Sequence, residues 1–266
     1  MYAITSADNA HYKALLKLAH SSRERRKEGM SLLDGVHLVG AFHDVGGRPE
    51  LVAVSKSGAD NPEIQTLLRT LTPQSKLLLS DALFRQLSSV ETPTGILATV
   101  RTPQPRGAPP IGESCVLLEN IQDPGNLGSI LRSAAGAGFK QVLLSKGAVH
   151  AWSPRVLRAG MGAHFSLQIY EQVDMLDFAR AFRGSVIATS HHDGICVFEA
   201  DLAGTIALVF GNEGSGVSPA LSDLAHERVA IPMPGRVESL NVAAAAAVCL
   251  FERVRQTRAT LHPAGS

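Results

Sequence analysis

The sequence predicts an α/β protein with two domains, and three features carry this prediction. Short apolar segments alternate with segments of helical character along most of the 266 residues. Residues 102–113 (TPQPRGAPPIGE) are rich in proline and glycine, which is typical of an extended connection rather than a helix or central strand. Several apolar segments lead directly into glycine-containing loops, as strands of parallel sheets do. We therefore expect a small α/β domain over residues 1–105 and a larger one over residues 106–266.

The first domain is expected to be a small α/β sandwich, because its helices fall between its strands. The predicted elements are helices at 10–20 and 61–71 and strands at 31–33, 51–55, 76–79 and 95–100. Basic residues gather in and just after the first helix: Lys13, Lys17, Arg23, Arg25, Arg26 and Lys27. Such a run is usually a solvated surface, but beside a nucleic acid it would contact phosphates.

The second domain repeats strand and helix in turn. The predicted strands are 115–119, 141–145, 185–190, 206–210 and 229–232, and the helices are 129–136, 153–159 and 240–257. Alternation of this kind favours a parallel sheet covered on both faces, with ligands at the carboxyl ends of the strands.

Composition and charge are those of an ordinary soluble globular protein, with 45% apolar and 18% charged residues. The formal net charge of +1 gives no overall basic field. Cys115, Cys196 and Cys249 are an odd number of cysteines and predict reduced thiols rather than a disulfide framework. Without a signal-peptide pattern or an apolar stretch of membrane-spanning length, the chain is expected in the cytoplasm and away from membranes.

The most informative segment is 229–248, where a short apolar strand runs into Pro-Met-Pro-Gly and then Ser-Leu-Asn. Proline removes backbone donors and glycine permits positive φ, so this loop is expected to leave carbonyls unpaired. Ser239 and Asn241 lie at the start of the last helix, where they would either bind a ligand or simply cap the helix. The alanines 243–247 would let another backbone approach closely. Together these features predict a ligand cradle.

Two further motifs follow apolar strands, at 121–133 (IQDPGNLGSILRS) and 208–218 (LVFGNEGSGVS). The second imitates a phosphate-binding Walker A loop, but Val217 stands where that loop needs lysine. Glu213 would add negative charge where phosphates would lie, so the sequence argues against binding of a nucleoside triphosphate. The remaining structural alternative is a flexible turn between strand and helix.

Taken together, the three motifs resemble those of the SpoU (TrmH) family of RNA ribose 2′-O-methyltransferases in the SPOUT superfamily. The matching residues are Asn126 and Arg132, then Gly211, Glu213 and Gly216, then Ile231, Pro232, Met233, Ser239, Leu240, Asn241 and Val242. The resemblance implies a parallel-sheet SPOUT fold with a deep trefoil knot, S-adenosylmethionine as cofactor, an RNA substrate, and a homodimer with its site at the subunit interface. The first domain more diffusely resembles the substrate-binding domain that precedes many SpoU catalytic domains, which implies RNA binding.

The resemblance also implies roles for particular residues. The implied catalytic residues are Asn126, Arg132, Glu213, Ser239 and Asn241, and the implied cofactor-binding residues are Gly211, Ile231 and Leu240. The family arginine is assigned to activating the ribose hydroxyl, but a guanidinium stays protonated and is a poor base. We therefore interpret Arg132 as a clamp on the adjacent phosphate that stabilises the developing alkoxide. Glu213 would orient Arg132 or a substrate hydroxyl. Taken alone, Arg132 would be a solvated arginine and Asn126 a helix cap.

Substrate and metal binding leave alternatives. Ribosomal RNA is preferred as substrate, since the N-terminal module is most familiar in enzymes that act on it. Transfer RNA is the second choice, and a non-catalytic RNA-binding protein of the same fold is the alternative of a different class. His191, His192 and Cys196 suggest a metal cluster, but adjacent histidines usually point apart and no second pair completes four ligands. No metal is expected.

Overall fold

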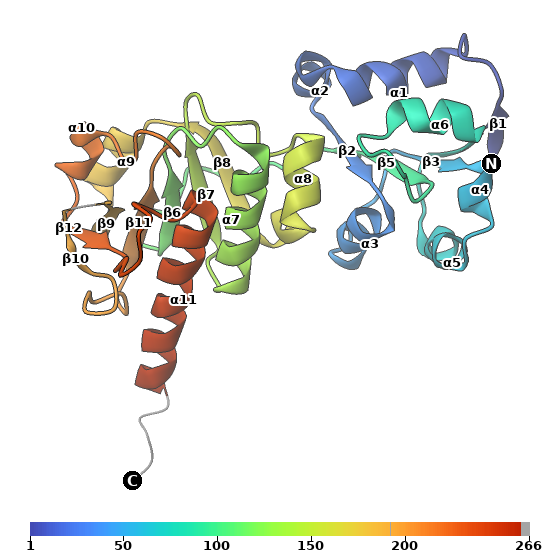
Figure 1. The fold of residues 1–266 in the computed structure, drawn as a ribbon. Coiled ribbons are helices and arrows are strands. Elements are labelled where there is room, and N and C mark those ends of the chain that lie inside the picture. The colour runs from blue at the N-terminus through green and yellow to red at the C-terminus, as the bar shows by residue number, and fades with distance from the viewer. Residues whose placement is uncertain (192, 262–266) are drawn as a thin grey trace. The chain divides into compact units, whose positions relative to one another are not determined.

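The computed structural model describes residues 1–191 and 193–261, and the chain divides into two compact units. Residues 1–103 and 152–165 form the first unit, and residues 104–151 and those from 166 onward form the second (Figure 1). Residues 102–113 contain no helix or strand, as predicted. Within the described residues, no helix has the length and apolar character needed to cross a membrane.

The first unit is built on a mixed five-stranded sheet. Its strands are β1 (Tyr2–Ile4), β2 (Met30–Asp34), β3 (Leu51–Ser55), β4 (Ser75–Leu79) and β5 (Ile96–Arg101), in the order β1-β4-β3-β5-β2. Strands β1, β4 and β3 run parallel, whereas β5 is antiparallel to both β3 and β2. The four predicted strands are confirmed to within a residue at each end. Only β1 was not predicted, because three largely exposed residues carry no clear alternation.

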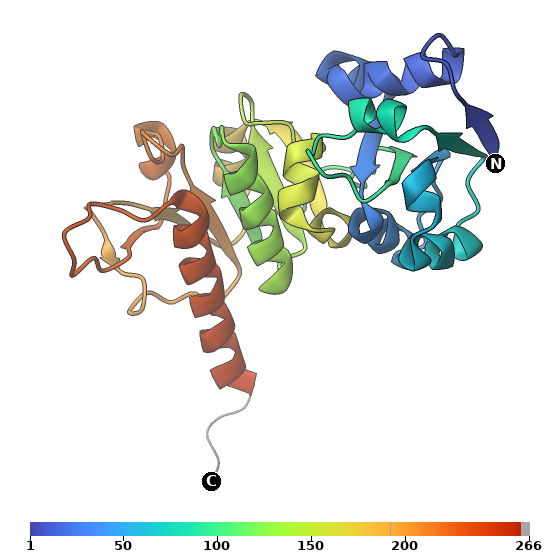
Figure 2. The same cartoon turned by 45° about the vertical axis from the view of Figure 1, so that its right-hand side comes forward.

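Helices cover both faces of this sheet. They are α1 (Ala10–His20), α2 (Ser22–Glu28), α3 (Val36–Asp44), α4 (Lys56–Ala59), α5 (Pro62–Thr70) and α6 (Asp81–Leu87), and α8 (Pro154–Gly160) also belongs to this unit. Figure 2 shows α1 and α6 on one side of the sheet and α3 and α5 on the other. Between α1 and α6 the Tyr12 side chain is completely buried, and its hydroxyl donates to the Leu83 carbonyl at 3.1 Å. The predicted sandwich is confirmed. Helix α3 was missed because its apolar residues directly follow β2.

The basic run of the first unit is not uniformly a surface feature. Arg25 is only 7% exposed, and its guanidinium donates to the carbonyls of Leu18 and Ala19 in the last turn of α1. These carbonyls have no partner within the helix, so Arg25 completes the end of α1. The expectation that Arg25 could contact phosphate is therefore wrong, while Lys17 and Arg23 remain exposed.

The second unit contains a seven-stranded sheet in which every pairing is parallel, as predicted. Its strands are β6 (Cys115–Leu118), β7 (Gln141–Ser145), β8 (Gln168–Val173), β9 (Ser185–Thr189), β10 (Ile195–Cys196), β11 (Ile206–Phe210) and β12 (Glu227–Ala230). Their order is β10-β12-β9-β11-β6-β7-β8. Strands β12, β9, β11 and β6 are consecutive neighbours, so the loops at their carboxyl ends lie along one edge. The trefoil knot stays a prediction.

Helices flank this sheet on two sides. They are α7 (Pro124–Gly136), α9 (Met175–Ala181), α10 (Pro219–Ser222) and α11 (Val242–Leu261). Helices α7 and α11 pack against each other, and α9 packs against α10 above a buried apolar cluster. Figures 1 and 2 both show the last turns of α11 extending beyond the sheet.

The boundaries of two helices near the motifs differ from the prediction. Helix α7 begins at Pro124 rather than at residue 129, because the Asp123 carboxylate accepts the Asn126 N–H at 2.8 Å and proline suits the first helical position. Asp123 is therefore the cap, and the alternative that Asn126 caps the helix is wrong. Helix α11 begins at Val242 rather than at residue 240.

A close approach of two glycines in the first unit generates a stability prediction. A Cβ on Gly58 would lie 2.5 Å from the Gly95 carbonyl oxygen and 2.8 Å from its Cα. Gly58→Ala is expected to lower the free energy of unfolding by about 1–3 kcal/mol, because backbone must move to admit the methyl group. Chemical denaturation followed by circular dichroism measures the change.

Gly40→Ala is the matched control. Gly40 lies within α3 and nothing would lie within 4 Å of its Cβ. Alanine is the better helix former, so this variant should equal or slightly exceed the parent in stability. Equal stabilities for the two variants would contradict the proposed role of the Gly58–Gly95 contact.

Candidate functional site

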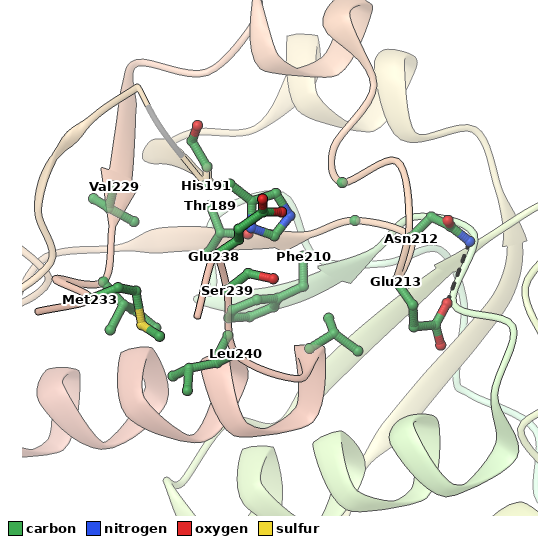
Figure 3. Close-up of a pocket in the computed structure, with 16 residues that line it drawn as sticks. Thr189, His191, Phe210, Asn212, Glu213, Val229, Met233, Glu238, Ser239 and Leu240 are labelled. Atoms are coloured by element: carbon green, nitrogen blue, oxygen red, sulfur yellow. Dashed lines mark hydrogen bonds between the residues drawn. The ribbon is translucent and has the colours of Figure 1, made fainter. Parts of the chain in front are cut away.

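A pocket opens at the carboxyl ends of β9, β11 and β12 (Figure 3). Gly211, Ile231 and Leu240, which the sequence predicts as cofactor-binding residues, all line it, together with Glu213 and Ser239. The second and third motifs therefore meet in one concave space.

The loop after β11 is closed tightly upon itself. The Asn212 N–H donates to the Gly216 carbonyl at 3.0 Å, and the Gly216 N–H donates to the Asn212 carbonyl at 2.9 Å. A Cβ on Gly211 would overlap the backbone of Gly216 and Val217, so glycine is required at that position. Gly216 has φ +69°, which also favours glycine. The glycines of the second motif thus serve a compact loop whose shape is fixed by its backbone.

Asn212 holds this loop against the strand next to it. Its Nδ2 donates to the Asn120 carbonyl at 2.9 Å, while its Oδ1 accepts the Gly214 and Ser215 N–H groups at 3.0 and 3.2 Å. Asn120, directly after β6, has the positive φ of 54° that asparagine tolerates better than most residues. Asn212 was not among the predicted site residues, although an asparagine next to a glycine at the end of a strand is a usable signal.

Glu213 joins the second motif to the first. Its carboxylate accepts the Gln122 N–H at 3.2 Å, the Asp123 N–H at 3.0 Å and the Asn126 Nδ2 at 3.1 Å. Partial burial by itself would raise the pKa of the Glu213 carboxyl, but these hydrogen bonds outweigh burial and hold the pKa below its usual value of 4.5. Glu213 is thus ionised at neutral pH, and it contacts Asn126 rather than Arg132.

Asn241 joins the third motif to the first. Its Nδ2 donates to the Asn126 Oδ1 at 2.9 Å, and its own Oδ1 accepts the Ala243 N–H at 2.9 Å at the start of α11. The Asn241 side chain therefore caps α11 and contacts Asn126 at the same time, so the two interpretations of Asn241, helix cap and site residue, do not exclude each other. Glu213, Asn126 and Asn241 form a continuous hydrogen-bonded chain, called here the motif bridge, which unites all three motifs.

Ser239 and Arg132 are the two predicted catalytic residues outside the motif bridge. Ser239 lines the pocket and is exposed, whereas Arg132 is exposed on α7. Six residues beyond Asn126 in a helix correspond to about 9 Å along the axis and about 120° around it. Within the residues that the structure describes, the Arg132 side chain makes no hydrogen bond or ion pair. Asn126 and Arg132, the two matched residues of the first motif, are therefore not brought together within one chain.

The pocket also contains residues that the sequence analysis missed as ligand contacts. They are Thr189, Ser190, Phe210, Asn212, Val229, Glu238 and Ala245, with His191 considered only as a metal ligand and Gly216, Met233 and Val242 only as motif matches. Thr189 is the last residue of β9, and Ser190 and His191 follow it, so polar residues at the end of a predicted parallel strand were the available signal.

The metal interpretation finds no support in the part of the chain that the structure describes. Across residues 1–191 and 193–261, no group of three or more His, Cys, Asp or Glu side chains could hold a metal ion. His192 lies outside the described residues, so the expected absence of a metal stays a prediction.

The chain was compared with known families and proteins. A model described as the SpoU rRNA Methylase family matches residues 113–251, and one described as an MRM3-like substrate binding domain matches residues 9–98. The chain is similar to the 23S rRNA (guanosine(2553)-2′-O)-methyltransferase RlmP of Bacillus subtilis, with 31% identity over 94% of this chain and 98% of that protein.

Two solved structures resemble the whole chain. A structure described as an RNA 2′-O ribose methyltransferase is 32% identical, with a TM-score of 0.83 over 96% of this chain and 98% of that chain. The SpoU methyltransferase AviRb from Streptomyces viridochromogenes, in complex with AdoMet, is 27% identical, with a TM-score of 0.83 over 93% of this chain and 98% of that chain.

Glu213→Gln tests the motif bridge. Because the folded-state pKa is lowered, the carboxylate stabilises the fold above pH 4.5, and this contribution is lost as pH falls through the folded-state pKa. At pH 7 the variant should unfold with a free energy lower by about 1 kcal/mol, a modest figure because Glu213 is exposed. The difference from the parent should shrink below pH 4.5, as measured by denaturant titration across pH.

Glu199→Gln is the control for the loss of a carboxylate. Glu199 is exposed near β10, and its side chain has no hydrogen bond among the described residues. It should change stability little at any pH. If Glu213→Gln lowered the free energy of unfolding equally at every pH, the three donors would require the shape of the side chain and not its charge.

Proposed function

Because this chain belongs to the SpoU rRNA methylase family, we propose that it transfers a methyl group from S-adenosylmethionine to a ribose 2′-hydroxyl of ribosomal RNA. The observation that carries the proposal is the motif bridge beside the pocket, since it draws residues of all three motifs into one site. A chain that only kept the fold would not need Glu213, Asn126 and Asn241 bonded to one another.

The proposed cofactor site is the pocket itself, with Gly211, Ile231 and Leu240 as its contacts. The residues present fit this ligand: Ile231 and Leu240 offer apolar walls, and Gly211, which has no side chain, lets the ligand approach the backbone at the end of β11. The AdoMet complex of the similar AviRb chain supports this assignment. When bound, S-adenosylmethionine would supply an electrophilic methyl group.

The proposed mechanism assigns orientation and charge stabilisation to the protein. Asn126, Ser239 and Asn241 would hold the reacting ribose, and Glu213 would keep the Asn126 amide in place through its hydrogen bond. Arg132 stays protonated, so it would bind the neighbouring phosphate and stabilise the 2′-oxygen as its proton leaves. In this scheme Glu213 is a positioning residue that acts through Asn126.

Ribosomal RNA is the proposed substrate class, with transfer RNA as the alternative. The similarity to RlmP along nearly the whole of both chains supports ribosomal RNA. The match of residues 9–98 to a substrate binding domain supports a role of residues 1–105 in holding the RNA. Exposed Lys17, Arg23 and Arg26 are available there for phosphates. A cytoplasmic location is part of the proposal, and the three unpaired cysteines agree with a reducing compartment.

We also propose a homodimer in which the site is shared between subunits. On α11, Ala244 and Phe251 are exposed and lie seven residues apart, hence on one face of the helix. Phe251 is 50% exposed beside Gly136 of α7, an apolar surface of the kind that a second subunit would cover. Arg132, exposed on α7 and outside the motif bridge, is the residue that such a partner would bring to the site.

Label transfer from methyl-labelled S-adenosylmethionine tests the function. Unmodified ribosomal RNA should accept label, and the labelled linkage should resist alkali, because cleavage needs a free 2′-hydroxyl. Arg132→Ala should lower kcat at least about 100-fold while the Kd for the cofactor, measured by calorimetry, stays the same. Arg180→Ala, an exposed arginine on α9, is the control that should keep full activity.

Each outcome separates the candidates. Label in transfer RNA alone would favour the second substrate class, and no label in either RNA would favour the binding protein. Loss of cofactor binding in a folded Arg132→Ala protein would contradict its assignment to the RNA.

Phe251→Glu tests the shared site. A carboxylate at this position would be buried without a partner at the proposed interface, so the variant should be monomeric by light scattering and inactive in label transfer. Phe198→Glu, at a phenylalanine 51% exposed near β10, is the matched control and should remain an active dimer. An active dimer for Phe251→Glu would remove this face of α11 from the interface.

A further inference from the structure

The pocket has an unbalanced charge. Among the described residues that line it, two are carboxylates, Glu213 and Glu238, and none is lysine or arginine. His191 is the one imidazole of the lining. A site with this composition repels phosphates and favours a ligand that carries positive charge.

The two carboxylates differ in how they are engaged. Glu213 accepts three hydrogen bonds from the loop of the first motif, so its charge is already met by N–H dipoles. Glu238 is exposed, and within the described residues its side chain makes no hydrogen bond or ion pair. Figure 3 shows the Glu238 carboxylate among the pocket side chains and well apart from that of Glu213. Among the described residues that line the pocket, Glu238 is therefore the carboxylate whose charge meets no hydrogen bond or ion pair.

We propose that Glu238 is a specificity-determining residue that lets the pocket distinguish the sulfonium form of its ligand from the thioether form. This inference rests on the proposed function. Methyl transfer breaks the S–CH₃ bond and leaves the electron pair on sulfur, so the sulfonium becomes a neutral thioether. The ribose oxygen gains the methyl group, and its proton passes to water. Cofactor and product thus differ at one atom by one methyl group and one positive charge.

A fixed carboxylate acts on this difference and on little else. The adenosine and amino-acid parts are the same in S-adenosylmethionine and S-adenosylhomocysteine, so their contacts with the pocket contribute equally to both affinities. The attraction between Glu238 and the sulfonium is present only before transfer. Its consequence is tighter binding of the cofactor than of the product, which favours product release and turnover.

Calorimetry with three probes on the full-length protein tests the proposal. The probes are S-adenosylmethionine, sinefungin, which carries an ammonium near the position of the sulfonium, and S-adenosylhomocysteine. Glu238→Gln should weaken the two cationic probes by roughly five- to tenfold and change the Kd of the thioether by less than about twofold. The selectivity of the parent protein should also decline as salt is raised, because the site is open to solvent.

Glu227→Gln is the matched control, since Glu227 lies at the start of β12 and does not line the pocket. It should leave all three dissociation constants unchanged. Equal weakening of all three probes by Glu238→Gln would overturn the proposal, because the carboxylate would then contact a part common to them. No change for any probe would overturn it as well. Failure of the parent protein to bind any probe would instead contradict the proposed function.

Discussion

The carboxylate of Glu213 is the interaction on which the site depends. It lies at the end of β11 and accepts hydrogen bonds from the backbone that follows β6, where the first motif begins. Those N–H groups precede α7 and have no partner within the helix, so a single ionised side chain accepts from both of them. The same carboxylate fixes the Asn126 amide, which in turn accepts from Asn241. Without the Glu213 carboxylate, the loops of the three motifs would lose hydrogen bonds that fix their positions relative to one another.

This arrangement is possible because the order of strands in the sheet departs from their order in the chain. Strands β6 and β11 are neighbours although nearly ninety residues separate them, and β9 and β12 complete the same edge. Residues from distant parts of the sequence thus converge at one edge of the sheet. Because the parallel sheet already brings the strand ends together, the polar side chains at these ends can reach one another.

Pattern reasoning recovered the parallel sheet because β6, β7 and β11 are continuous apolar runs, which is how strands buried on both faces read. The helices α2, α3, α4, α6 and α9 and the strands β1, β8 and β10 were not predicted, because segments this short show no clear hydrophobic period. Placement of Glu213 next to Asn126 could not be predicted from spacing, since it depends on which strands are neighbours. Arg25 shows the same limit: a basic run looks uniform in sequence, and only the end of α1 decides which member is buried.

The two hydrogen bonds of the Asn241 side chain have a consequence for biosynthesis. This residue starts α11 and also holds Asn126, so the site is complete only after the last helix has formed. A chain emerging from its N-terminus can fold its first unit and much of the parallel sheet before this segment exists. Until Asn241 has been synthesised, the nascent polypeptide therefore lacks the hydrogen bond that joins the third motif to the first. A chain that stops before Asn241 is left without the motif bridge.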